Sequence, residues 1–125
     1  MSENPQIGKI GWIDMTVDDA DGLRDFYQSV VGWETEPVSM GDYSDYSMIA
    51  PGSGDAVSGI CHARGTNAGM PGGWLIYITV ADADESAAAC TANGGEVLVE
   101  PRGLAGGRFC VIKDPSGAVA ALYQP

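Results

Sequence analysis

Asp14 and Tyr77 are the side chains whose type and placement could support chemistry. Asp14 lies between Trp12 and Thr16 in a segment that alternates between two faces, and Tyr77 lies in a similar segment later in the chain. A carboxylate can anchor a cationic ligand or act as a general base, and a phenol tuned by burial can act as the acid. The sequence therefore suggests a charged ligand contact or a metal-free acid–base pair, with Asp14 as base and Tyr77 or Tyr123 as acid.

The sequence lacks the other common chemical motifs. It has one histidine, His62, and its three cysteines (Cys61, Cys90 and Cys110) show no Cys-x-x-Cys spacing. These numbers favour neither a disulfide framework nor a zinc site, and the cysteines are expected to be small buried hydrophobic residues. No phosphate-binding loop or dinucleotide fingerprint is present. We therefore expect no cofactor and no metal ion.

The composition limits the partners. The chain has 125 residues, of which 17 are acidic and 6 are basic, and its formal net charge is −11. Such a charge repels phosphate backbones and anionic headgroups, so nucleic acid and membrane partners are not expected. The sequence has neither a membrane-length apolar run nor an export signal at its start, which predicts a cytoplasmic location.

The sequence repeats itself. Residues 11–21 resemble residues 73–84, and a glycine-rich segment at 65–73 lies between the halves. We expect one domain, 1–125, with modules at about 7–64 and about 73–125. Each module is predicted to have the order βαβββ, because its alternating and helical hydrophobic periods follow one another in that order. The predicted first-half elements are a strand at 9–17, a helix from about Asp19 to Gly32, and strands at 33–38, 43–50 and 56–62. Those of the second half are a strand at 74–81, a helix from Asp82 to Asn93, and strands at 96–101, 107–113 and 118–124.

Several motifs occur in an order and spacing typical of one family. They include Thr16-Val17-Asp18-Asp19 before the first helix and Asp114-Pro115-Ser116-Gly117 before the last strand. With the paired βαβββ modules, they make the chain resemble the vicinal oxygen chelate superfamily of glyoxalases, bleomycin-resistance proteins and extradiol dioxygenases. The resemblance covers nearly the whole chain. It implies an α+β fold in which two modules form a cupped eight-stranded mixed sheet.

The resemblance also says where metal ligands would be. Enzymes of this superfamily hold a divalent ion with side chains on the first, fourth, fifth and eighth strands, and the matching positions here are Trp12, Gly59, Leu75 and Ala121. None of these residues is a metal ligand, so the metal chemistry of the family is not carried over. His62 is expected on the face opposite Gly59 or at the mouth of the cavity, as a hydrogen-bonded residue rather than a ligand.

In this resemblance, the cupped face is lined by aromatic and apolar residues. Three interpretations stay open: Trp12 and Tyr77 fill the space left by the metal, they bind a planar or cationic small molecule with Asp14 as anchor, or the site is a metal-free enzyme. The candidate ligand-binding residues are Trp12, Asp14, Leu75, Tyr77, Ala121, Tyr123 and Arg108.

Two further expectations concern partners of these residues. Arg108, Arg102 or Arg64 could neutralise Asp14, in which case the ligand need not be cationic. The aromatic residues Trp33, Tyr43 and Tyr46 could rim the cavity or cover a dimer contact. A homodimer is expected from the family resemblance.

Overall fold

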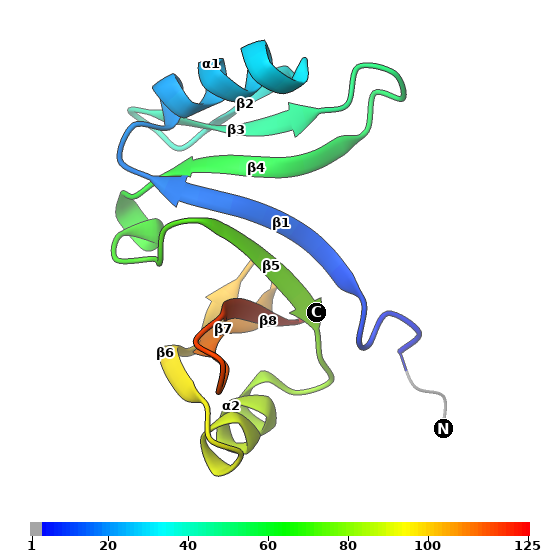
Figure 1. The fold of residues 1–125 in the computed structure, drawn as a ribbon, viewed down its shortest axis with the longest axis vertical. Coiled ribbons are helices and arrows are strands. Elements are labelled where there is room, and N and C mark those ends of the chain that lie inside the picture. The colour runs from blue at the N-terminus through cyan, green and yellow to red at the C-terminus, as the bar shows by residue number, and fades with distance from the viewer. Residues whose placement is uncertain (1–3) are drawn as a thin grey trace. The chain divides into compact units, whose positions relative to one another are not determined.

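The computed structural model describes residues 4–125, which divide into two compact units (Figure 1). One unit is Ile13–Trp74. The other combines the residues up to Trp12 with Leu75–Pro125. Residues 8 and 9 join this second unit through two backbone hydrogen bonds with Thr79: the Gly8 N–H donates to the Thr79 carbonyl at 2.8 Å, and the Thr79 N–H donates to the Lys9 carbonyl at 2.9 Å.

The described Ile13–Trp74 unit contains one α-helix, a short 3-10 helix and four strands. The strands lie in the order β2-β3-β4-β1. β1 runs parallel to β4 with Asp14 opposite Gly59, and the β2–β3 and β3–β4 pairs are antiparallel. The element bounds are β1 (Ile10–Val17), whose first three residues belong to the other unit, α1 (Ala20–Val31), β2 (Glu34–Ser39), β3 (Ser44–Ile49), β4 (Ala56–His62) and a short 3-10 helix (Gly65–Asn67).

The ends of α1 follow from two residues. The Asp19 carboxylate accepts a hydrogen bond from the Gly22 N–H at 3.0 Å, which satisfies a donor that the first turn leaves free. Gly32 ends the helix at a φ of 84°, a left-handed conformation that glycine adopts without strain. Between these ends, Ala20 packs with Met48 and Ile60 of the sheet, and Leu23 and Tyr27 pack around this core.

The second unit repeats the pattern. Its strands lie in the order β5-β8-β7-β6; β5 and β8 are parallel, and β8–β7 and β7–β6 are antiparallel. Asp82 caps α2 by accepting a hydrogen bond from the Glu85 N–H at 3.0 Å. Ala87 of α2 packs on Cys110 and Leu122. The element bounds are β5 (Trp74–Thr79), α2 (Ala83–Ala92), β6 (Glu96–Leu104), β7 (Gly107–Lys113) and β8 (Val119–Gln124).

The predicted fold class is confirmed, with two βαβββ modules and the elements in the expected order. Two boundaries differ by more than one residue. β5 ends at Thr79 rather than at residue 81, and β6 continues past the predicted 101 to Leu104. β6 lies at the end of the strand order, where Pro101 does not interrupt a central ladder, and its register with β7 shifts on both sides of Val99. Within residues 4–125, no helix is long and apolar enough to cross a membrane.

Candidate functional site

The aromatic residues predicted to bind ligand share one face of the β5–β8 pair. Tyr77 lies opposite Ala121, and Thr79 lies opposite Tyr123. Ile78 and Leu122 belong to the core beneath α2. Because side chains alternate along a strand, Tyr77, Ala121 and Tyr123 lie on the face turned away from α2, and so does Leu75. The division into two faces that the sequence predicts for β5 is therefore confirmed.

Most of this face is buried. Leu75 and Tyr77 are 4% and 8% exposed and Ala121 has no exposed surface, whereas Trp12 and Tyr123 are half-buried. The Tyr123 hydroxyl donates a hydrogen bond to the Ala105 carbonyl at 3.1 Å. That bond connects the Tyr123 side chain to the turn between β6 and β7 and so fixes the orientation of its ring.

The positions at which the resemblance expects metal ligands do not fit a metal ion. Leu75 and Ala121 are buried apolar residues, Trp12 has no metal-binding atom, and Gly59 has no side chain. In the part of the chain that the structure describes, no group of three or more His, Cys, Asp or Glu side chains could hold a metal ion.

Asp14 lies in the other unit, half-buried on β1 opposite Gly59. Two positions along, Thr16 lies opposite Cys61 of β4. Burial raises the pKa of the Cys61 thiol to about 12, and the nearby charges of Asp14 and Asp45 and a hydrogen bond to Asp45 add to the rise. Both carboxylates therefore lie near the Cys61 thiol. Asp45, which is only 5% exposed, is a residue that sequence reasoning missed.

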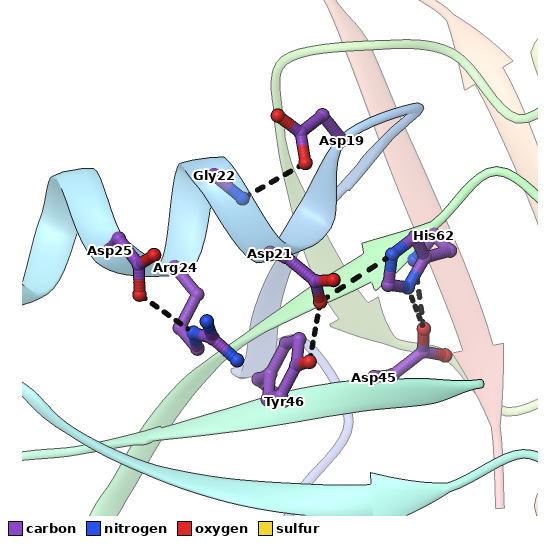
Figure 2. Close-up of polar contacts among 8 residues, drawn as sticks. All are labelled: Asp19, Asp21, Gly22, Arg24, Asp25, Asp45, Tyr46 and His62. Atoms are coloured by element: carbon purple, nitrogen blue, oxygen red, sulfur yellow. Dashed lines mark hydrogen bonds and ion pairs between the residues drawn. The ribbon is translucent and has the colours of Figure 1, made fainter.

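A second polar arrangement, the His62 cluster, consists of Asp21, Asp45, Tyr46 and His62 (Figure 2). His62 Nδ1 lies 3.4 Å from Asp45 Oδ1, and His62 Nε2 lies 3.7 Å from Asp21 Oδ1. Asp45 Oδ1 also accepts the His62 backbone N–H at 2.8 Å, and Asp21 Oδ1 accepts the Tyr46 hydroxyl at 2.5 Å. The cluster joins α1, β3 and β4, and the His62 side chain is only 11% exposed.

His62 lies on the α1 side of β4, in line with the face expected from alternation with Gly59. The hydrogen bond to Asp21 is the first cause of the raised pKa of Tyr46, and burial is the second. The Arg24 guanidinium lies over the Tyr46 ring at 4.5 Å and also pairs with Asp25 at 2.9 Å. The contacts of Asp21 with Tyr46 and His62 can hold α1 on the sheet. Both ring nitrogens of His62 face carboxylates of the protein, those of Asp45 and Asp21.

The arginines considered as partners of Asp14 contact other groups. Arg108 donates two hydrogen bonds to Asp84, at 3.1 and 2.9 Å. Arg64 lies 3.3 Å from Asp42 and stacks over the Tyr43 ring at 4.1 Å. Arg102 lies over Phe109 at 5.2 Å. The spacing of these residues in the sequence carries no signal for such pairings, because each joins different elements.

Comparisons with known proteins agree with the fold. A sequence model of the Glyoxalase/Bleomycin resistance protein/Dioxygenase superfamily matches residues 9–122. CFP32 of Mycobacterium tuberculosis, provisionally named a glyoxylase, is 33% identical over 121 residues, which is 96% of this chain and 45% of that protein. The anthracycline biosynthesis protein DnrV of Streptomyces peucetius is 30% identical over 129 residues, covering 94% of this chain and 47% of that protein. The chain thus spans about half the length of these curated relatives.

A solved structure supports the same architecture. Methylmalonyl-CoA epimerase from Mycobacterium tuberculosis superposes with a TM-score of 0.55 at 20% identity, covering 100% of this chain and 93% of that one. At this identity the likeness shows the fold alone.

Proposed function

Because the chain belongs to the Glyoxalase/Bleomycin resistance protein/Dioxygenase superfamily but has Trp12, Gly59, Leu75 and Ala121 at the expected ligand positions, we propose that it binds a small organic molecule without a metal ion. The observation that carries the proposal is that Tyr77, Ala121 and Tyr123 share one strand face, on which Ala121 stands at an expected ligand position and the half-buried Tyr123 ring lies two residues further along.

The ligand class follows from the chemistry of the residues. Aromatic faces attract planar rings and cations, and small-molecule sites are mostly apolar with a few polar groups that fix orientation. Asp14, half-buried on β1 opposite Gly59, is the proposed charged anchor. The ligand is therefore a planar organic molecule, with a cationic group as the favoured feature. The name of the Streptomyces relative supports planar probes, because anthracyclines are planar polycyclic aromatic molecules.

A titration with a planar aromatic cation such as berberine tests this proposal. We expect quenching of tryptophan fluorescence and a raised melting temperature, and we expect Trp12→Ala and Asp14→Asn each to weaken binding at least about tenfold, or ~1.4 kcal/mol. The control for the acid is Asp18→Asn, an exposed aspartate just beyond the end of β1. Matched neutral and anionic planar compounds measure the contribution of charge. If no compound of the planar set binds, or if both variants bind as the wild type does, the proposal fails.

A catalytic role is the second candidate, with Asp14 as general base and Tyr77 as acid. Its supporting observation is that Asp14 is half-buried and contributes to the raised pKa of the buried Cys61 thiol, because a carboxylate held among protein groups can act as a general base. Isomerisation of a methylglyoxal–glutathione adduct, a redox-neutral proton transfer, supports the enzyme if it is lost in Asp14→Asn. Binding of the planar probe without conversion of this adduct supports the binding protein.

A cytoplasmic location is part of the proposal. Cys61, Cys90 and Cys110 are free thiols, a state typical of a reducing compartment. Fractionation of cells expressing the tagged chain tests it, and recovery with secreted or membrane material contradicts it.

A further inference from the structure

A groove on the second unit is used neither by the proposed ligand residues nor by the His62 cluster. It lies between α2 and β6 and has a volume of about 280 Å³. Small-molecule sites are mostly apolar, with a few polar groups that fix the orientation of the ligand. The groove has this composition, since its polar lining residues are Asp84, Thr91 and Glu100 and its apolar ones are Ala87, Ala88, Val97 and Pro101. We call this cavity the α2–β6 groove.

The α2–β6 groove and the aromatic residues proposed to bind ligand lie on opposite faces of the sheet. Val97 packs against the core of buried residues beneath α2. Tyr77, Ala121 and Tyr123 lie on the face turned away from α2. A molecule bound in the groove therefore does not touch these three residues, and the groove is a separate site.

The two acidic residues of the groove lie at the same end of it. Arg108 Nη2 donates hydrogen bonds to Asp84 Oδ1 at 2.9 Å and to the Pro101 carbonyl at 3.4 Å. Because Pro101 follows Glu100 in the chain, this guanidinium brings both acids to one end. A second bond, from Arg108 Nε, completes the neutralisation of Asp84, whereas no ion pair within residues 4–125 involves Glu100. This end of the groove therefore carries one uncompensated negative charge.

The other end of the groove is neutral and polar. The Thr91 hydroxyl donates a hydrogen bond to the Ala87 carbonyl at 3.4 Å, so its oxygen can still accept one. An α-helix rises about 1.5 Å per residue, which places Thr91 about 10 Å from Asp84 along α2. Between these ends lie the small side chains of Ala87 and Ala88. The groove therefore fits an elongated molecule with a positive end, a narrow apolar body and a polar far end.

Charge and size together decide the class of occupant. We infer that the α2–β6 groove binds a small primary amine, with its ammonium group at Glu100 and Asp84 and its apolar body on the alanines of the groove. An ammonium group has three donors and one positive charge, which suits an uncompensated carboxylate beside an ion pair. A cavity of about 280 Å³ lies just below the range of ligand pockets, so the occupant is smaller than a drug-sized molecule.

A titration followed by NMR of the backbone amides of the whole chain tests the inference. The probe is the linear aminohexanol with its amine and hydroxyl at opposite ends, and its uncharged counterpart is the linear hexanediol. Neither is aromatic, so neither belongs to the planar class proposed for the other face. We expect the amine to shift the amides of α2 and β6 with a dissociation constant on the order of 1 mM, and the diol to bind at least about fivefold more weakly. Added salt should weaken binding of the amine, because it screens the attraction to the exposed Glu100.

Two matched pairs of variants locate the site. Glu100→Gln removes the uncompensated charge and should weaken binding of the amine at least about fivefold. Its control is Glu96→Gln, which changes an exposed glutamate of β6 outside the groove and should bind as the wild type does. Ala88→Leu fills the groove and should weaken binding at least about tenfold, whereas Ala89→Leu, at an exposed alanine of α2 outside the groove, should not. The spread of the amide signals confirms that each variant is folded, and Ala88→Met replaces Ala88→Leu if the latter does not fold.

The inference is overturned if no saturable shift of the α2 and β6 amides appears up to about 20 mM amine. It is equally overturned if the diol binds as tightly as the amine, or if Glu100→Gln and Ala88→Leu bind as their controls do. Asp14→Asn should leave the shifts caused by the amine unchanged, and their loss in this variant would assign the amine to the other site and also overturn the inference. Failure of the planar-ligand proposal leaves this one unaffected, because the two proposals use different residues.

Discussion

Arg108 of β7 and Asp84 of α2 form a bidentate ion pair, with Nε 3.1 Å from Oδ2 and Nη2 2.9 Å from Oδ1. The same Nη2 lies 3.4 Å from the Pro101 carbonyl of β6. One guanidinium thus links three elements of the second unit. This geometry gives Arg108 a structural role in addition to the ligand contact predicted from the sequence.

A double-mutant cycle separates the two roles of Arg108. Arg108→Gln and Asp84→Asn should show a coupling of about 0.5 kcal/mol in urea unfolding, because exposed ion pairs contribute little. If Arg108 also contacts the ligand, Arg108→Gln weakens binding of the planar probe and Asp84→Asn does not. Equal binding by both variants removes Arg108 from the ligand site, and zero coupling contradicts the ion pair as a stabilising contact.

The Cys61 thiol predicts a loss of stability at alkaline pH. Its pKa is raised from 9.0 to about 12, so the unfolded chain releases this proton at lower pH than the folded chain does. The stabilisation is fully present below pH 9 and is lost between pH 9 and about 12. The free energy of unfolding of the wild type, measured with urea, should therefore fall as the pH rises through this window. The fall should be smaller in Cys61→Ala.

Cys110 provides the internal comparison for this effect. Burial raises the pKa of the Cys110 thiol from 9.0 to about 11. The contribution of this thiol to the free energy of unfolding is therefore lost between pH 9 and about 11, a narrower range than for Cys61. Identical pH dependence in Cys61→Ala and the wild type would contradict the assignment to Cys61.

The turn between β6 and β7 contains a strained residue. Ala105 has a φ of 49°, and Gly106, which follows it, has a φ of 82°. Two-residue hairpin turns with positive φ at both positions favour asparagine or glycine. Ala105→Gly should raise the free energy of unfolding by ~0.5 kcal/mol, measured by chemical denaturation.

A second alanine controls for the general effect of glycine. Ala68 has a φ of −61°, a conformation open to any residue. Ala68→Gly should destabilise the chain, because glycine adds freedom only to the unfolded state. If Ala105→Gly and Ala68→Gly both lower the free energy of unfolding, the backbone strain at Ala105 does not limit stability.

Two tyrosines beside His62 test the His62 cluster. The Tyr46 hydroxyl bonds to the Asp21 carboxylate, whereas the Tyr43 hydroxyl makes a 3.3 Å bond to the Arg64 carbonyl. Hydrogen bonds to charged groups are the stronger kind, so Tyr46→Phe should cost about 1 kcal/mol and Tyr43→Phe less than about half of that. Hydrogen exchange of α1 amides should rise in Tyr46→Phe. Equal costs for the two variants would show that the cluster does not hold α1.

Local chemistry explains which parts of the fold were predictable. The helix ends at Asp19, Gly32 and Asp82 follow from capping by nearby residues, and the strands follow from alternation. The extension of β6 did not follow, because Pro101 argues against a strand unless the strand is known to lie at an edge.

The candidate site was only partly predictable. The shared face of Tyr77 and Ala121 depends on alternation within strands, which the sequence shows. The approach of Asp21 and Asp45 to His62 depends on how α1 lies on β3 and β4. Asp45 lies near the start of β3 and His62 at the end of β4, so the antiparallel register of these two strands brings the carboxylate to the imidazole.

The backbone bonds of Gly8 and Lys9 to Thr79 bear on any attempt to cut the chain in two. A fragment starting at Leu75 would lack Gly8 and Lys9, whose backbone groups pair with both backbone groups of Thr79. A fragment ending at Trp74 would carry Gly8 and Lys9 without their partner. The halves of this duplicated sequence are consequently not independent building blocks, and an excised C-terminal half would need the first dozen residues restored to it, for instance by circular permutation.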